Sequence, residues 1–199
     1  MTTGLQRVGM FGGAFDPPHR AHVSLAQAAI AQLALERLYV FPTGNAWHKD
    51  RTLTAAEDRL AMTRLAFAGV PFVEVDDREL RRTGPTYSVE TLRELQAEHP
   101  GALLHLLMGE DQAAGFTRWQ AWEEIADLAI LCVAARGSGE GVQALQALPN
   151  VRVRLLALPQ MPESATEIRT RLTRGQDIAT LVEPAVARYI ETHHLYPTR

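Results

Sequence analysis

The chain has 199 residues, of which 46% are hydrophobic and 22% charged, so it can bury a sizeable core and is not expected to be disordered in bulk. Its formal net charge of -3 argues against a general binder of nucleic acid, and any nucleotide it binds should be small and held by local groups. The one cysteine, Cys132, excludes an internal disulfide and a cysteine-rich metal site, and its apolar surroundings predict a buried thiol.

The first residues lack the basic and apolar stretches that are typical of a secretion signal. No apolar run approaches the ~20 residues that are needed to cross a bilayer. We therefore expect a cytoplasmic protein that does not bind a membrane.

Short apolar runs alternate with helical patterns along most of the chain. Six runs are predicted to be strands: 5–11, 37–41, 71–75, 103–108, 129–134 and 151–156. Helical spacing predicts helices at 19–35, at 54–68, where Thr54 and Glu57 form a capping box, at 88–98 and at 118–128. Beyond residue 160 the pattern is helical at 164–174, near 177–181 and at 184–194.

This alternation predicts an α/β fold: a Rossmann-like, doubly wound and mostly parallel sheet with helices on both faces. Residues 1–199 are interpreted as one domain, with a helical C-terminal segment from about residue 164 to 199. Flexible loops are expected at 42–53, 137–141 and 157–163. In such sheets ligands bind beyond the carboxyl ends of the strands, so motifs that follow strands should converge on one cleft.

The stretch GGAFDPPHRAH, residues 12–22, follows the first predicted strand. Gly12 and Gly13 would let a phosphate approach the backbone closely, and a helix beginning near Pro18 would direct its free N–H groups at an anion. His19 and His22 are three residues apart, so both lie on one face of the first turn. The stretch therefore predicts a site for a polyphosphate.

Other interpretations of this stretch are weaker. A zinc site is disfavoured because the His-Glu-x-x-His pattern and a cluster of further ligands are both missing. The Gly-x-Gly-x-x-Gly fingerprint of a dehydrogenase is also missing.

Arginine supplies nineteen of the twenty basic side chains, and Lys49 is the only lysine. Chance could explain this, but a site that needs a compact, flexible ammonium group would explain it as well.

The pattern Gly-Gly-x-Phe-Asp-Pro-x-His-x-x-His, residues 12–22, resembles the signature of the bacterial nicotinate-mononucleotide adenylyltransferases, members of the nucleotidyltransferase superfamily with the (His/Thr)-x-Gly-His motif. Ala21 stands where that family usually has glycine. The segment 42–49 resembles the family's loop after the second strand and puts Lys49 at the position of a phosphate-contacting lysine, although Trp47 replaces a proline.

Three later blocks extend the resemblance. Residues 77–92 are similar to a family block that implies a pyridine pocket lined by Thr86 and Tyr87. Gly109-Glu110-Asp111 follows a strand, where a carboxylate can accept hydrogen bonds from ribose, and Trp119 matches the position that stacks on the nicotinate ring. Residues 164–169 resemble the family's Ile-Ser-x-x-x-(Ile/Val)-Arg motif, with Glu163 in place of its apolar residue; structure alone could explain Ser164 and Glu167 as a capping box.

The resemblance implies that ATP and nicotinate mononucleotide react to give deamido-NAD and pyrophosphate by direct in-line transfer. The expected catalytic residues are His19, His22, Lys49 and Arg169. The expected ATP-binding residues are Gly12, Gly13, Phe15, His22, Gly109, Asp111, Ser164, Thr166, Ile168 and Arg169. The expected residues for the mononucleotide are Asp16, Lys49, Thr86, Tyr87 and Trp119.

Mg²⁺ is expected to arrive with the phosphates of ATP and to keep most of its waters, so no protein metal site is predicted. A homo-oligomer is compatible with the sequence. Two alternatives stay open: a related adenylyltransferase that acts on nicotinamide mononucleotide or phosphopantetheine, and a nucleotide-sensing module without catalysis.

Overall fold

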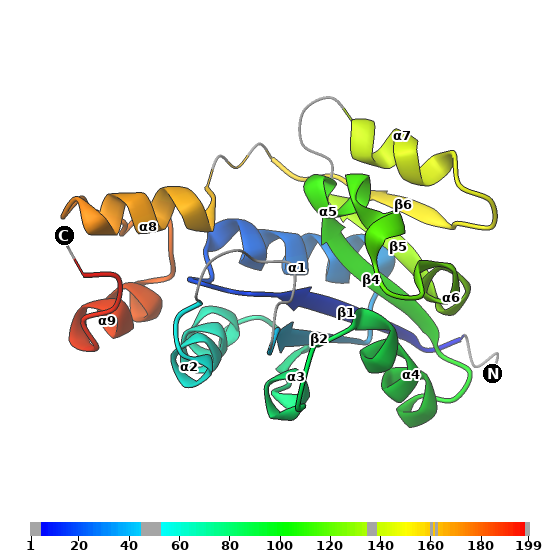
Figure 1. The fold of residues 1–199 in the computed structure, drawn as a ribbon, viewed down its shortest axis with the longest axis horizontal. Coiled ribbons are helices and arrows are strands. Elements are labelled where there is room, and N and C mark those ends of the chain that lie inside the picture. The colour runs from blue at the N-terminus through cyan, green and yellow to red at the C-terminus, as the bar shows by residue number, and fades with distance from the viewer. Residues whose placement is uncertain (1–4, 45–52, 135–138, 160, 162, 198–199) are drawn as a thin grey trace.

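The computed structural model describes residues 5–44, 53–134, 139–159, 161 and 163–197. Within them, six parallel strands form one sheet in the order β3-β2-β1-β4-β5-β6 (Figure 1). The strands are β1 (Arg7–Gly13), β2 (Arg37–Pro42), β3 (Val73–Val75), β4 (Leu103–Gly109), β5 (Ala129–Ala134) and β6 (Val153–Leu156). All six predicted strands are confirmed, as is the doubly wound sheet, which is parallel throughout.

The helices lie on both faces of this sheet (Figure 1). They are α1 (Arg20–Leu33), α2 (Ala56–Phe67), α3 (Arg78–Arg81), α4 (Ser88–Glu98), α5 (Glu110–Ala114), the 3-10 helix η1 (Phe116–Arg118), α6 (Trp122–Leu128), α7 (Glu140–Gln146), α8 (Ala165–Thr173) and α9 (Pro184–Thr192). The predicted C-terminal helical segment corresponds to α8 and α9.

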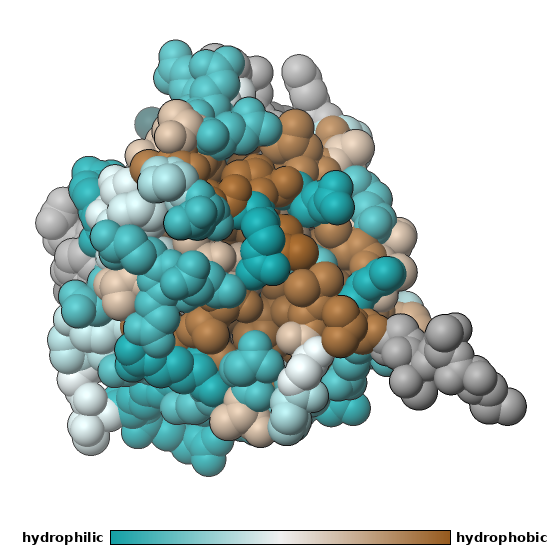
Figure 2. Space-filling model, turned by 90° about the vertical axis from the view of Figure 1, so that its right-hand side faces the viewer, coloured by the Kyte–Doolittle hydropathy of each residue, from teal (hydrophilic) through white to brown (hydrophobic). Residues whose placement is uncertain are grey.

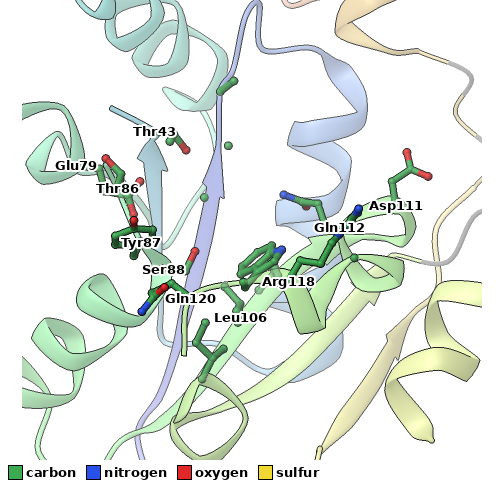
Figure 3. Close-up of a pocket in the computed structure, with 17 residues that line it drawn as sticks. Thr43, Glu79, Thr86, Tyr87, Ser88, Leu106, Asp111, Gln112, Arg118 and Gln120 are labelled. Atoms are coloured by element: carbon green, nitrogen blue, oxygen red, sulfur yellow. The ribbon is translucent and has the colours of Figure 1, made fainter. Parts of the chain in front are cut away.

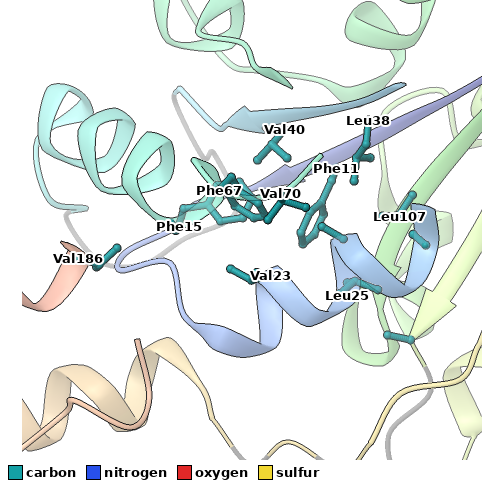
Figure 4. Close-up of a cluster of buried hydrophobic side chains, with 14 of the residues drawn as sticks. Phe11, Phe15, Val23, Leu25, Leu38, Val40, Phe67, Val70, Leu107 and Val186 are labelled. Atoms are coloured by element: carbon teal, nitrogen blue, oxygen red, sulfur yellow. The ribbon is translucent and has the colours of Figure 1, made fainter. Parts of the chain in front are cut away.

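The core has two parts because successive side chains of a strand point to opposite faces. Phe11 of β1 belongs to a cluster with residues of α1, α2, α8 and α9, and Figure 4 shows Phe11, Phe67 of α2 and Val186 of α9 within it. Met10, its neighbour in β1, belongs to a second cluster with residues of α4, α5, α6 and α7. Cys132 is buried in the first cluster, as predicted.

Four local predictions are wrong in detail. The helix at 54–68 begins at Ala56 with Ala55 as its N-cap and no side-chain cap, so Thr54 and Glu57 form no capping box. Residues 177–181 form turns, and 118–128 is divided between η1 and α6 because Ala121 adopts a left-handed conformation. The helix expected near Pro18 begins at Arg20. Short helices α3, α5 and α7 were not predicted, and α7 begins inside the expected loop 137–141.

The strand order reverses between β1 and β4. From β1 the chain builds outward through β2 and β3, and then it returns to β4 on the other side and builds outward to β6. Two neighbouring strands whose following loops turn to opposite sides leave a crevice at their carboxyl ends. β1 ends at Gly13 and β4 ends at Gly109, so the crevice lies between the motif at residues 12–22 and the motif at residues 109–111.

Apolar side chains also reach the surface. Figure 2 shows one face of the molecule, on which hydrophobic residues gather and polar residues surround them. The large hydrophobic side chains with the highest exposure are Leu5, Leu65, Phe72 and Leu155. Exposed apolar surface of this kind is compatible with a homo-oligomer, as the sequence is.

Candidate active site

Two cavities meet at the switch point between β1 and β4. We call the first the histidine cleft; it has a volume of about 840 Å³, and its lining includes His19, His22 and Arg169. We call the second the tryptophan pocket; it has a volume of about 440 Å³, and its lining includes Thr86 and Trp119. The two share a wall made of Gly12, Gly13, Ala14, Asp111 and Gln112. One ligand could therefore extend from one cavity into the other past the glycines that end β1.

The two histidines sit at the start of α1. His19 is the extended N-cap residue, and its backbone N–H donates a hydrogen bond of 3.2 Å to Nδ1 of His22. The imidazole rings stack with centroids 3.7 Å apart, and Phe15 lies edge-on to His22 at 5.0 Å. Because Nδ1 of His22 accepts a hydrogen bond, the proton of its neutral ring is on Nε2. The local fold thus makes Nε2 a donor at the edge of the cleft.

The start of α8 forms another part of the same cleft. Ser164 caps this helix, with its Oγ accepting a hydrogen bond from the N–H of Glu167 at 3.1 Å. Nη1 of Arg169 donates to the backbone oxygen of Asp16 at 2.7 Å, and Nη2 donates to Oγ1 of Thr166 at 3.1 Å. These bonds hold a guanidinium group from the C-terminal segment beside the loop that follows β1. Residues at the N-termini of α1 and α8 therefore line one cavity, and the positive end of a helix dipole favours an anion.

Most of the residues expected to bind ATP line this cleft, together with His19, which was expected to be catalytic: Gly12, Gly13, Phe15, His22, Gly109, Asp111, Ser164, Thr166 and Arg169. Ile168 differs, because its side chain is fully buried in the core and its N–H bonds to the carbonyl of Ser164. Ile168 lines neither cavity and so supports the helix without facing a ligand. Lys49 lies outside the described residues.

Asp16 was expected beside the mononucleotide, but it lines the histidine cleft and is absent from the lining of the tryptophan pocket. It is only 1% exposed. Its carboxylate accepts hydrogen bonds from the hydroxyl of Tyr196 at 2.5 Å and from the N–H of Thr54 at 3.4 Å. These bonds connect the loop after β1 to the C-terminal tail and to the residues before α2, so the carboxylate stabilises the loop.

The tryptophan pocket has polar and aromatic walls. Figure 3 shows Thr86 and Tyr87 on one side of β1 and Gln112 and Arg118 on the other. Trp119 packs against buried Phe116 with ring centroids 5.8 Å apart, which limits the motion of the indole. Oγ1 of Thr86 is buried and has no hydrogen-bond partner among the described residues. A pocket with an aromatic face and an unsatisfied hydroxyl suits a flat ring that carries a polar substituent.

A buried acid that the sequence did not single out also lines this pocket. Glu79 is 3% exposed, and Thr91 Oγ1 donates a hydrogen bond of 2.7 Å to its Oε1. Burial raises the pKa of Glu79 to about 7, against the opposing effect of Thr91 and Arg82. Gly44 packs so closely on the carbonyl of Glu79 that a Cβ would collide with it. In the sequence, Glu79 looks like one more member of a solvated charge run.

Arg59 connects the loops around the cleft, and it was not among the residues predicted from the sequence. It lies in the first turn of α2 and is only 2% exposed. Nη1 donates to the carbonyls of Ala14 and Thr43 at 3.0 and 2.8 Å, and Nε donates to the carbonyl of Thr54 at 3.0 Å. Arg59 therefore fixes the loop after β1 to the loop after β2.

Among the described residues, no group of three or more His, Cys, Asp or Glu side chains is arranged to hold a metal ion. None of the described helices combines the length and apolar character that crossing a bilayer requires.

Comparison with known proteins gives a consistent result. Residues 10–171 match the family model described as cytidylyltransferase-like. A protein of Albidiferax ferrireducens named "Probable nicotinate-nucleotide adenylyltransferase" is 51% identical over 197 residues, which cover 98% of this chain and 100% of that protein. A protein of Bordetella petrii with the same name is 43% identical over 197 residues, covering 96% of this chain and 100% of that protein.

Solved structures are similar as well. The nicotinic acid mononucleotide adenylyltransferase of Plasmodium falciparum, complexed with NaAD, superposes with a TM-score of 0.80 over 98% of both chains. The same protein complexed with APC gives a TM-score of 0.77 over 98% of both chains. The identity is 20% in each case, so this likeness concerns the fold.

Proposed function

This chain belongs to the cytidylyltransferase-like family and, within it, to the nicotinate-nucleotide adenylyltransferases, and it is therefore a nucleotidyltransferase; on that premise we propose that it joins ATP to nicotinate mononucleotide, giving deamido-NAD and pyrophosphate. ATP occupies the histidine cleft, and the nicotinate ring occupies the tryptophan pocket. The observation that carries this proposal is the wall that the two cavities share at Gly12 and Gly13. It lets the phosphate groups of two substrates meet over bare backbone.

The reaction is a direct transfer. An anionic phosphate oxygen of the mononucleotide attacks the α-phosphorus of ATP, the bond to the bridging oxygen breaks, and its electron pair leaves with pyrophosphate. Phosphate oxygens are already ionised near neutral pH, so the attack needs no strong general base. Catalysis then consists of holding the groups in line and stabilising the charge that develops.

The residues of the histidine cleft fit this task. His22 donates from Nε2 to a phosphate oxygen, and its geometry is fixed by the bond between Nδ1 and His19. Arg169 neutralises charge on the leaving pyrophosphate, and the N-terminal end of α8 adds backbone donors. Lys49 supplies a further cation from the loop after β2, as its family position implies.

Magnesium enters as part of the substrate MgATP. The ion would reduce the negative charge of the phosphates.

In the tryptophan pocket, Trp119 stacks on the pyridine ring, and the hydroxyl of Thr86 gives or accepts the hydrogen bond that it lacks in the described residues. Tyr87 lines the same wall.

Replacing Trp119 by leucine should raise the KM for the mononucleotide and change the KM for ATP little, because only the mononucleotide contacts the indole. Trp122 offers a matched control, since it packs on Phe116 and is absent from the lining of the pocket.

The test of the function is release of pyrophosphate by the purified protein. We expect release with MgATP and nicotinate mononucleotide, and little with MgATP alone. Nicotinamide mononucleotide and phosphopantetheine are assayed in parallel at the same concentration. Faster release with either of them would replace the proposed acceptor, and no release with any acceptor would favour a nucleotide-sensing module.

A further inference from the structure

The C-terminal tail reaches the loop that follows β1. The hydroxyl of Tyr196 donates a hydrogen bond of 2.5 Å to Oδ1 of Asp16, 180 residues away in the sequence. Asp16 is only 1% exposed, and Tyr196 packs against the hydrophobic cluster of α1, α2, α8 and α9. A hydrogen bond to a buried carboxylate is among the stronger ones in a protein. This bond attaches the tail to the loop that follows β1.

Asp16 connects Tyr196 to Arg169 through two hydrogen bonds. Its backbone oxygen accepts the hydrogen bond of 2.7 Å from Nη1 of Arg169, while its carboxylate is bonded to Tyr196 and to the N–H of Thr54. If the carboxylate moves, the peptide group that holds the guanidinium moves with it. Asp16 and Arg169 both line the histidine cleft, whereas Tyr196 is not among its lining residues.

Tyr196 remains a donor across the range in which an enzyme works. Burial raises the pKa of its phenol above the ordinary value, and the hydrogen bond to Asp16 raises it further. The phenol therefore keeps its proton.

We propose that Tyr196 is a positioning residue of the phosphate site, which acts through Asp16 to hold Arg169 where it meets the phosphates of the nucleotide. The proposal rests on the proposed function for the identity of the ligand. It assigns Tyr196 no contact with substrate: its effect is on geometry, and a shift of about 1 Å in a positioning group can cost up to ~10²-fold in rate.

A second tyrosine supplies a matched control. Tyr189 of α9 also donates its hydroxyl to a carboxylate, that of Asp58, at 2.9 Å. Neither Tyr189 nor Asp58 lines the histidine cleft or the tryptophan pocket. Replacing either tyrosine by phenylalanine removes one bond between the C-terminal region and the rest of the protein. Only the change at Tyr196 removes a bond that leads to Arg169.

The test measures binding of MgATP by calorimetry without an acceptor, and turnover with nicotinate mononucleotide. The proteins are the wild type, Tyr196→Phe, Tyr189→Phe, Arg169→Ala and the double variant Tyr196→Phe with Arg169→Ala. We expect Tyr196→Phe to weaken binding of MgATP roughly 5-fold and to lower kcat roughly 10-fold. Tyr189→Phe should leave both unchanged.

The double variant separates positioning from a general structural effect. If Tyr196 acts through Arg169, its loss should change binding and kcat by less than about two-fold once Arg169 is alanine. The proposal is overturned if Tyr196→Phe behaves like Tyr189→Phe, or if the two losses multiply in the double variant. A wild type that binds MgATP but does not use nicotinate mononucleotide would contradict the proposed function alone. The MgATP affinities of the wild type, the single variants and the double variant would still decide the role of Tyr196.

Discussion

The backbone N–H of His19 donates a hydrogen bond to Nδ1 of His22, and the two imidazole rings stack with centroids 3.7 Å apart. One histidine thus orients the other and selects the nitrogen that faces outward with a proton. The chain provides this arrangement because His19 has extended backbone as the N-cap of α1 and His22 lies one turn later. The His22 side chain is therefore already ordered in the folded protein, so that binding a phosphate does not have to order it.

Replacing His22 by alanine should lower turnover by ~10²-fold or more, because the donor to the transferring phosphate is lost. The melting temperature should stay near that of the wild type. Turnover is followed by release of pyrophosphate, and folding by circular dichroism. His193→Ala is the control, since that imidazole stacks on Tyr189 at 3.8 Å and lines neither cavity. Normal turnover by His22→Ala would remove this residue from the mechanism.

Replacing Lys49 by arginine should lower turnover although the charge is kept. A guanidinium is planar and rigid, whereas an ammonium on a flexible stem can follow the phosphates as charge shifts toward pyrophosphate. The reverse change at the exposed C-cap of α8, Arg174→Lys, should have no effect on turnover. If Lys49→Arg is fully active, the single lysine of the chain is an accident of composition.

Replacing Arg59 by methionine should lower the free energy of unfolding by about 3 kcal/mol, because three partly buried carbonyl groups lose their shared donor while the methionine fills the space. Urea titration measures the change from the midpoint. Arg64→Met on the same helix is the control: Arg64 is largely exposed and pairs with Asp77 at 3.8 Å. Its change should stay below about 0.5 kcal/mol. Equal effects of the two changes would show that Arg59 does not tie the loops together.

The sequence predicts the sheet well because buried parallel strands are continuously apolar and are bounded by helical patterns. It also predicts that His22 and Arg169 meet, because their motifs follow different strands that end at one edge. The short helices α3, α5 and α7 were missed because elements of four to seven residues carry little periodicity.

Other features depend on contacts that no local pattern records. Arg59 lies in a helix that also carries Glu57, Asp58 and Arg64, so its burial has no local signal. Ile168 was expected at the nucleotide because it belongs to a motif that is typical of the family, yet its side chain is buried in the core and it is the neighbouring Arg169 that lines the histidine cleft.

Glu79 provides a prediction about pH. Its pKa is about 7 in the folded protein and close to the ordinary value of 4.5 when unfolded, so between these values the folded state binds more protons than the unfolded state. The free energy of unfolding should therefore fall as the pH rises from 4.5 to 8, by about 3 kcal/mol in total. Glu79→Gln removes this titration and keeps an oxygen that can accept the bond from Thr91.

The measurement is the difference between Glu79→Gln and wild type in urea unfolding at several pH values, which cancels the titration of all other groups. The variant should gain stability relative to wild type as the pH rises, most steeply between pH 5 and 7. Glu124→Gln is the control, because Arg93 lowers the pKa of that exposed carboxyl. The expected pH dependence therefore has the opposite sign, and this variant should lose a little stability relative to wild type as the pH rises through 4. A flat difference for Glu79→Gln would mean that its carboxyl is hydrated in the tryptophan pocket, since desolvation is the largest of the effects that raise its pKa.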